Sequence, residues 1–183
     1  LSRISNFLQS QATEKGIELK FKIHGDLPDF IKSDETRVHQ ILINIIGNAI
    51  KFTSEGSVEV TVKCNQKQAE IKQASLEFIV KDTGPGIPLD LQEKLFKPFV
   101  QADSGVTKKY GGTGLGLVLS RKLASAMNGR VSLLESTPGK GSTFIVKITP
   151  EIIYEKSSMS KSEVSKNRKD LSRFEKKFSG VRI

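Results

Sequence analysis

Residues 44–53 read NIIGNAIKFT and lie at the end of an amphipathic segment that begins near residue 33. Ser33, followed by Asp34 and Glu35, supplies a capping hydroxyl and acidic groups where a helix dipole is positive. Apolar residues then recur at spacings of three and four, at Val38, Ile41, Leu42, Ile45, Ile46, Ala49 and Ile50. The sequence therefore predicts a helix over residues 33–52 that buries one face against a sheet.

The neighbouring face of this predicted helix is polar. Asn44 and Asn48 are four residues apart, so their amides project from one side, with Lys51 one turn further along. Gly47 leaves space beside them. Amide oxygens suit Mg²⁺, and a lysine provides a positive charge for phosphate oxygens. The pattern is consistent with a metal and phosphate site, although an ordinary polar helix face would also explain the two asparagines.

Two glycine-rich segments follow the helix. The first, DTGPG at residues 82–86, places Asp82 at the end of a predicted strand, where its carboxylate can accept a hydrogen bond from the adenine amine. The second, GGTGLGL at residues 111–117, enters a predicted helix, whose free N–H groups favour phosphate. It lacks the P-loop spacing and a Rossmann βαβ unit. A plain strand-to-helix turn is the alternative explanation of the first segment.

Periodicity elsewhere predicts the remaining elements. Alternating apolar residues indicate strands near residues 17–23, 58–62, 76–80, 131–134 and 143–148, the second and third forming an antiparallel hairpin. Helices are predicted at residues 1–10, 88–95 and 115–127, and residues 100–112, which lack apolar periodicity, are expected to form a mobile loop. This order predicts an α+β fold, a two-layer α/β sandwich in which helices cover one face of a mixed sheet.

Composition limits the location and the partners. The chain has 183 residues, one cysteine (Cys64) and no apolar run approaching the roughly 20 residues of a membrane span. We therefore expect a reducing, cytoplasmic setting, with any membrane anchor outside these residues. Much of the +9 net charge lies in residues 151–183, where nine basic and five acidic residues are dispersed among serines. That pattern indicates a solvated linker and argues against nucleic-acid binding.

The three motifs together resemble the nucleotide-binding domain, a Bergerat-type fold, shared by histidine kinases, gyrase, Hsp90 and MutL. Residues 44–53 match the N box, 82–86 the G1 box and 112–116 the G2 box, while 96–99 (FKPF) resemble the F box of histidine kinases. The resemblance covers residues 1–148. Gyrase, Hsp90 and MutL carry a water-activating glutamate where this chain has Asn44, and an amide cannot accept that proton. A kinase is favoured over a hydrolase.

The resemblance implies an ATP-binding catalytic domain of a two-component sensor histidine kinase. Such a domain transfers the γ-phosphate of Mg-ATP to a histidine on a separate dimerisation domain. The residues implied to contact metal and phosphate, and to be catalytic, are Asn44, Asn48 and Lys51, with Asn48 as the Mg²⁺ ligand. Those implied to form the adenine pocket are Phe52, Asp82, Thr83, Gly84, Gly86 and Thr143. Those implied to wrap the phosphates through backbone amides are Gly112, Thr113, Gly114, Leu115 and Gly116.

The F box and the lid leave alternatives open. Phe96 and Phe99 would seat the lid on the core, or serve as simple core aromatics. Lys108, Lys109 and Tyr110 lie in the predicted lid, where a cation would meet the γ-phosphate, although ordinary solvated loop lysines would also explain them. Many relatives have an arginine where Gln101 stands. His24 and His39 lack the His-Glu-x-x-x-Pro-like context of the family's phosphoacceptor, so we expect both to be non-catalytic.

The resemblance also implies a domain organisation. Residues 1–14 would be the end of a dimerisation helix and a linker, 15–150 the catalytic domain, and 151–183 a basic linker. Residues 178–183 resemble the first strand of a receiver domain, which suggests a hybrid kinase, and a solvated, disordered tail is the alternative. The implied partners are the dimerisation domain and a response-regulator receiver domain, in a homodimeric parent whose membrane contacts lie elsewhere. The alternatives are a degenerate ATP-sensing module and a self-contained ATPase of the same superfamily.

Overall fold

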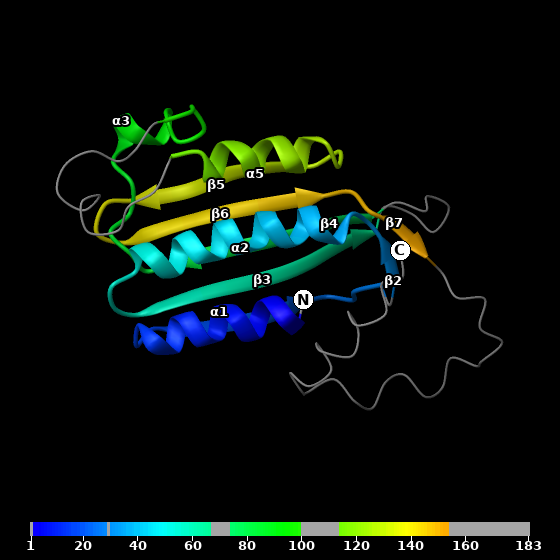
Figure 1. Cartoon of the computed structure of the whole chain (residues 1–183), viewed down its shortest axis with the longest axis horizontal. Coiled ribbons are helices and arrows are strands. Elements are labelled where there is room, and N and C mark those ends of the chain that lie inside the picture. The colour runs from blue at the N-terminus through cyan, green and yellow to red at the C-terminus, as the bar shows by residue number, and fades with distance from the viewer. Residues whose placement is uncertain (1, 29, 67–73, 100–113, 154–183) are drawn as a thin grey trace.

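The computed structural model describes residues 2–28, 30–66, 74–99 and 114–153 (Figure 1). Five strands form the main sheet in the order β1-β3-β4-β6-β5. Their bounds are β1 Glu18–His24, β3 Ser57–Gln66, β4 Ala74–Asp82, β5 Arg130–Thr137 and β6 Gly141–Ile148. β1 pairs with β3 in parallel and the other neighbours are antiparallel, so the predicted mixed sheet is confirmed.

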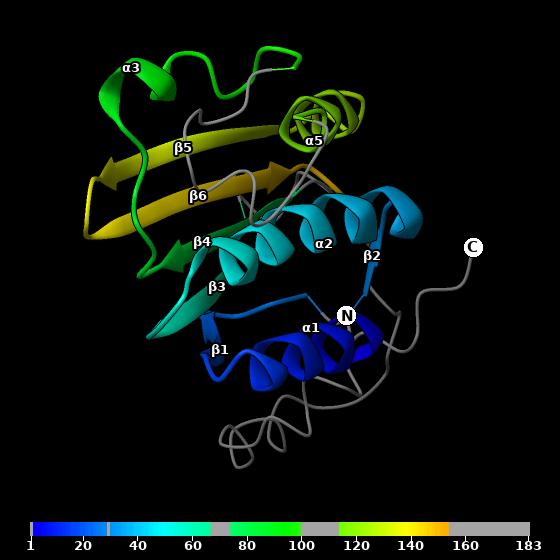
Figure 2. The ribbon, with the colours of Figure 1, turned by 60° about the vertical axis from the view of Figure 1, so that its left-hand side comes forward.

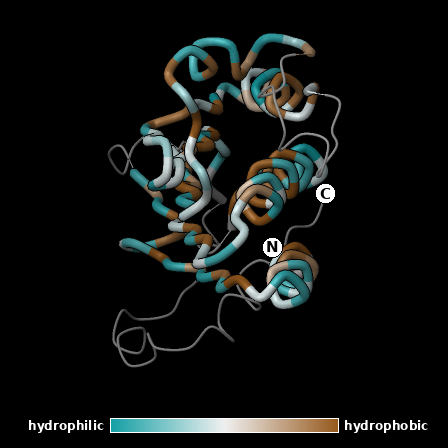
Figure 3. The backbone as a smooth tube through the Cα atoms, turned by 90° about the vertical axis from the view of Figure 1, so that its left-hand side faces the viewer, coloured by the Kyte–Doolittle hydropathy of each residue, from teal (hydrophilic) through white to brown (hydrophobic). Residues whose placement is uncertain are grey.

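Helices cover one face of this sheet. They are α1 (Ser2–Glu14), α2 (Glu35–Phe52) and α5 (Gly116–Ser125), which lie side by side on the same side of the strands (Figures 2 and 3). The core lies between the two layers. Val58, Val60 and Val62 of β3 point into it, as do alternate residues of β4, and they meet the buried stripe of α2. The two-layer α+β sandwich predicted from the sequence is therefore confirmed.

The N-cap of the central helix α2 lies one residue later than expected. Its N-cap is Asp34, whose carboxylate accepts a hydrogen bond from the Arg37 backbone N–H at 3.0 Å. Ser33 therefore does not provide the capping side chain that the sequence analysis assigned to it. The capping oxygen must reach the N–H of the third helical residue, and from Ser33 that residue would be Thr36. The end of α2 at Phe52 agrees with the prediction.

Two short strands were not anticipated. β2 (Phe30–Lys32) and β7 (Glu151–Ile153) pair antiparallel in a separate two-stranded sheet, with Lys32 Nζ 3.7 Å from a Glu151 carboxylate oxygen. Three residues are too few for an alternating pattern to be recognised. The predicted helix near residues 88–95 is also shorter, because α3 covers only Leu89–Gln92. Among the described residues, no helix is long and apolar enough to cross a membrane.

Candidate functional site

The polar face of α2 forms the floor of a groove that is bounded by α1 and α5. Asn44, Gly47, Asn48 and Lys51 all line this groove, which encloses about 1280 Å³. The three residues predicted to contact metal and phosphate are thus brought to one surface. Helical spacing produces this result, because positions four and seven apart fall on one side of a helix. Gly116, at the start of α5, lies on the opposite wall.

The Asn44 amide is held by α5. Its Nδ2 donates a hydrogen bond to Ser120 Oγ at 2.9 Å, and Ser120 is only 2% exposed. Its Oδ1 lies against Gly116, where an added Cβ would be 2.3 Å from that oxygen. A side chain at residue 116 would therefore push α5 away from α2 or displace the amide. The glycine at the helix start sets the distance between the N box and the G2 box.

The end of α2 carries the next two predicted residues. The Lys51 ammonium lies 5.2 Å from the centre of the Phe52 ring, which is 39% exposed. Lys15, which follows α1, donates from its Nζ to the carbonyl oxygens of Ile50, at 2.8 Å, and Lys51. A cation at these carbonyl oxygens, in the last turn of α2, complements the negative end of the helix dipole. Lys15 thus ties the end of α1 to the helical turn that bears Lys51.

Asp82 is the last residue of β4 and is 7% exposed. Its Oδ1 accepts hydrogen bonds from the backbone N–H groups of Gly84, at 2.9 Å, and Ser142, at 3.2 Å. Within the part of the chain that the structure describes, both hydrogen bonds to this carboxylate are accepted by Oδ1. Burial raises the pKa of Asp82 above its usual range, while the two N–H donors act in the opposite direction.

The loop after Asp82 joins the two halves of the site. A Cβ added to Gly84 would lie 3.3 Å from both the Phe52 carbonyl oxygen and Thr53 Oγ1, so the loop packs against the end of α2. Gly86 has a φ of +69°, and its Cβ would be 2.1 Å from the Thr137 carbonyl oxygen. The positive φ and the close backbone contact both require glycine here. The loop therefore connects the groove on α2 to the carboxylate at the end of β4.

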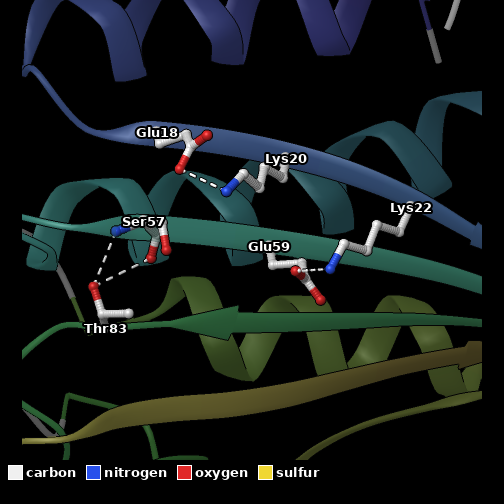
Figure 4. A network of polar contacts seen from close by, with 6 residues as sticks. All are labelled: Glu18, Lys20, Lys22, Ser57, Glu59 and Thr83. Atoms are coloured by element: carbon white, nitrogen blue, oxygen red, sulfur yellow. Dashed lines mark hydrogen bonds and ion pairs between the residues drawn. The ribbon is translucent and has the colours of Figure 1, made fainter.

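Two predicted threonines have other contacts. Thr83 Oγ1 accepts from the Ser57 N–H at 3.0 Å, toward the start of β3 (Figure 4). Thr143 donates from its hydroxyl to a Glu135 carboxylate oxygen at 3.2 Å and pairs across the sheet with Lys81. Because paired residues share a face, Thr143 lies on the side of the sheet opposite to Asp82.

The structure therefore places Ser142, and not Thr143, beside the Asp82 carboxylate, which the sequence analysis predicted to contact adenine. The contact comes from the Ser142 backbone N–H, which reaches Asp82 Oδ1. Ser142 directly precedes Thr143 in the segment that resembles the family, and only the register between β4 and β6 distinguishes the two residues. Ser120 and Ser136 were also missed, and their contacts with Asn44 and Ile87 left no local signal in the sequence.

The remaining predictions are only partly covered by the described residues. Gly112, Thr113 and the predicted lid, with Gln101, Lys108, Lys109 and Tyr110, lie outside them. Gly114 has a φ of +68°, and Leu115 is the N-cap residue of α5.

The two phenylalanines of the F box differ in their surroundings. Phe96 packs against the core below the Arg121 guanidinium, whose carbon is 5.1 Å from the ring centre. Phe99 is 76% exposed, with a φ of +61°. The sequence analysis allowed both residues to be core aromatics, and of the two only Phe96 packs against the core.

The two histidines that the sequence analysis expected to be non-catalytic lie on different elements. His24 is the last residue of β1. On α2, His39 Nε2 lies 3.3 Å from Glu35 Oε1. No group of three or more His, Cys, Asp or Glu in the described ranges could hold a metal ion.

Comparison with known proteins identifies the family. The family described as "Histidine kinase-, DNA gyrase B-, and HSP90-like ATPase" matches residues 33–152. Signal transduction histidine-protein kinase BarA of Escherichia coli is 39% identical over 159 residues, covering 85% of this chain and 17% of that protein. Autoinducer 2 sensor kinase/phosphatase LuxQ of Vibrio vulnificus is 40% identical, covering 82% of the chain and 17% of LuxQ. The chain thus spans less than a fifth of these relatives.

Solved structures agree with this assignment. Full-length ShkA in complex with AMPPNP aligns with a TM-score of 0.68 and 33% identity, over 84% of this chain and 30% of that one. The catalytic domain of histidine kinase ThkA aligns with a TM-score of 0.60 and 26% identity, over 82% of this chain and 90% of that one. The chain belongs to the histidine kinase-, DNA gyrase B- and HSP90-like ATPase family, as a domain of the kind that forms the ATP-binding catalytic part of sensor histidine kinases.

Proposed function

We propose that this chain binds Mg-ATP in the groove between α2 and α5 and transfers the γ-phosphate to a histidine on a dimerisation domain outside these residues. The observation that carries the proposal is the placement of Asn44, Asn48 and Lys51 along one groove, opposite Gly116. Phosphoryl transfer depends chiefly on positioning and charge neutralisation, so the nucleotide-binding domain needs no nucleophile of its own. ShkA, which aligns with this chain, was solved with an ATP analogue.

The base and the phosphates would be bound by different elements. Asp82 Oδ2 would accept from the adenine amine, and the backbone at Gly84 and Gly86 would form the wall of the base pocket. The N-terminus of α5, with residues 112–116, would face the phosphates, where helix N–H groups favour negative charge. Lys51 would add a positive charge for phosphate oxygens. Phe52, which is partly exposed beside the Gly84 contact, would pack near the base.

The residues present fit a magnesium ion. Asn48 and Asn44 provide hard amide oxygens on one groove wall, and Mg²⁺ typically combines one or two protein ligands with water and substrate phosphates. We infer that Asn48 is the protein ligand. Ser120 fixes Asn44, because the hydrogen bond to Nδ2 turns Oδ1 toward α5 and its phosphate-facing end. The bound ion would neutralise phosphate charge, while the chain holds the nucleotide in place.

The whole protein would contain further domains. The relatives extend far beyond the matched region, and one of them is named Hybrid signal transduction histidine kinase K of Dictyostelium discoideum. We infer that residues 1–14 continue a dimerisation helix, that 15–150 form the catalytic domain and that 151–183 lead toward a receiver domain. The partners would then be a phosphoacceptor domain and a receiver domain, in a homodimeric kinase.

The test is phosphotransfer to the parent's dimerisation domain supplied as a separate chain. With ATP labelled at the γ-phosphate, we expect acid-labile, base-stable label on that domain and none on this chain. Asn48→Ala and removal of Mg²⁺ should each abolish labelling, while Asn65→Ala, on the exposed end of β3, should leave it intact.

Two outcomes would contradict the proposal. Steady phosphate release by this chain alone, with no labelled histidine, would indicate a self-contained ATPase. Nucleotide binding without either reaction would indicate a sensing module.

A further inference from the structure

The loop that follows Asp82 is attached to the β5–β6 turn at two residues. Ser136 Oγ, near the end of β5, accepts a hydrogen bond from the Ile87 backbone N–H at 2.8 Å. The Gly139 backbone N–H, within the turn, donates to the Pro85 carbonyl oxygen at 2.7 Å. Gly86 lies between these two attachment points and packs directly on the Thr137 carbonyl. The loop backbone therefore takes its position from the turn.

Gln92, the last residue of α3, provides a second hydrogen bond to the Ile87 backbone. Its Nε2 donates to the Ile87 carbonyl oxygen at 2.7 Å and to the Ser136 carbonyl oxygen at 3.2 Å. The N–H and the C=O of Ile87 are thus both bound, one by Ser136 and the other by Gln92. All of these groups are partly buried, so water does not fully replace a lost partner.

The same turn also orients the Asp82 carboxylate. Ser136 Oγ lies 2.9 Å from Ser142 Oγ and donates to the Gly141 carbonyl oxygen at 3.2 Å. The backbone N–H of Ser142 in turn donates to Asp82 Oδ1. One hydroxyl group therefore connects the loop at Ile87 with the strand segment that holds the carboxylate. Ser136 and Gln92 are absent from the lining of the α2 groove, so they would act on a nucleotide only through the loop.

We propose that Ser136 and Gln92 are positioning residues that set the affinity for the adenine base by holding the Asp82–Ile87 loop against the β5–β6 turn. This inference rests on the proposed adenine site at Asp82. A loop released from the turn occupies its binding position for only part of the time, and apparent affinity falls by that fraction. The effect is specific to the base, because the Asn44 and Lys51 side chains and the start of α5 lie on other elements.

The experiment measures ADP and GDP binding by competition against a fluorescent ATP analogue, for the whole chain. Ser136→Ala removes the acceptor of the Ile87 N–H and is expected to weaken ADP binding about three- to tenfold. The affinity for GDP should change much less, so the ratio of ADP affinity to GDP affinity should fall. Gln92→Ala should act in the same direction, and Ser136→Thr, which keeps the hydroxyl, should recover most of the loss. Ser132→Ala, on the same strand, serves as the matched control and should bind as wild type does.

The outcomes separate this inference from the site on which it rests. Unchanged ADP affinity in both Ser136→Ala and Gln92→Ala would overturn the positioning role, as would equal weakening of ADP and GDP. If Ser136→Ala does not unfold cooperatively and is therefore not properly folded, the ADP affinity of Gln92→Ala alone tests the positioning role. A wild-type chain that does not prefer ADP to GDP, or whose preference survives Asp82→Asn, would instead overturn the adenine site itself.

Discussion

Asp82 is a single residue under two opposing influences. Burial disfavours its ionised form and raises its pKa, while the N–H groups of Gly84 and Ser142 favour that form. The net shift is upward. A carboxyl whose pKa is raised in the folded state stabilises the fold fully below its unfolded pKa, and this contribution is lost as the pH rises through the folded pKa. At neutral pH the ionised Asp82 therefore costs folding free energy.

Asp82→Asn should separate stability from function. The amide has the same shape, and its oxygen can still accept from Gly84 and Ser142, but no buried charge remains. At pH 7 we expect the free energy of unfolding to stay unchanged or to rise by up to about 1 kcal/mol. Urea unfolding at pH 7 and at pH 4 would measure this difference. A loss of several kcal/mol at neutral pH would show that the carboxylate is needed for folding.

The affinity for ADP should also depend on pH through Asp82. Protonation removes part of the carboxylate's capacity to accept a hydrogen bond, so binding should weaken as the pH falls through a pKa above the usual aspartate value of about 3.9. Titrations at several pH values would measure this effect. Asp82→Asn shares the protonation of the nucleotide phosphates and serves as the control. Identical pH profiles for the two proteins would contradict the assignment.

Among the site residues, local spacing was sufficient only for those on one helix. Asn44, Asn48 and Lys51 could be placed together because helix geometry fixes positions four and seven apart. The residues that orient the site could not be found in this way. Ser120 contacts Asn44 across 76 residues of chain, Ser142 contacts Asp82 across 60, and Ser136 contacts Ile87 across 49. Such pairs are created by the tertiary fold.

Between secondary-structure elements, the contact of α2 with α5 positions the residues that we propose to bind phosphate. Gly116 packs on the Asn44 amide oxygen, and Ser120, one turn later, accepts from its nitrogen. The two contacts fix both the separation of the helices and the orientation of the amide.

Gly116→Ala and Gly47→Ala form a matched pair of helix substitutions. A Cβ at Gly116 would lie 2.3 Å from Asn44 Oδ1, whereas one at Gly47 meets nothing within 4 Å. Glycine costs up to about 1 kcal/mol relative to alanine within a helix, so Gly47→Ala should stabilise the fold. Gly116→Ala should weaken binding of Mg-ADP at least about tenfold, because α5 must move away from α2 to make room for the added Cβ. Thermal unfolding and nucleotide titration measure both effects. Equal nucleotide affinity in Gly116→Ala and wild type would show that the close contact between α2 and α5 is not needed for nucleotide binding.

At the same scale, elements with a long repeating pattern were predicted and very short ones were not. The buried valines of β3 and the apolar stripe of α2 gave clear periodicities. β2 and β7, three residues each, are defined by pairing with one another across most of the chain. The cap of α2 was displaced by one residue, from Ser33 to Asp34, because both residues are favourable caps and only the geometry distinguishes them.

Over the whole molecule, the sheet separates a face covered by helices from a face that carries charged pairs. Lys22 and Glu59 form an ion pair of 2.5 Å on β1 and β3, and Lys20 pairs with Glu18 on the same strand (Figure 4). The Lys22 contact lowers the pKa of Glu59. Such exposed pairs contribute little to stability, which comes from the core below the helices.

The class of fold followed from the order of elements, but the sheet topology did not. Alternating strands and amphipathic helices predicted an α+β sandwich. The parallel pairing of β1 with β3 requires the chain to cross over through α2, and this crossover places the N box above the sheet. Asp82 and its loop reach the end of that helix only because β4 returns antiparallel beside β3. That arrangement depends on contacts distant in sequence.

The central claim is that this chain binds an adenine nucleotide through Asp82 beside the groove formed by α2 and α5. Calorimetric titration of wild type and Asp82→Asn with AMPPNP, in the presence of Mg²⁺ and with GDP as a control, tests it most directly. We expect saturable binding by wild type, at least about tenfold weaker binding by Asp82→Asn, and little binding of GDP. Absence of AMPPNP binding to folded wild-type protein, or equal affinity in the folded variant, would contradict the claim.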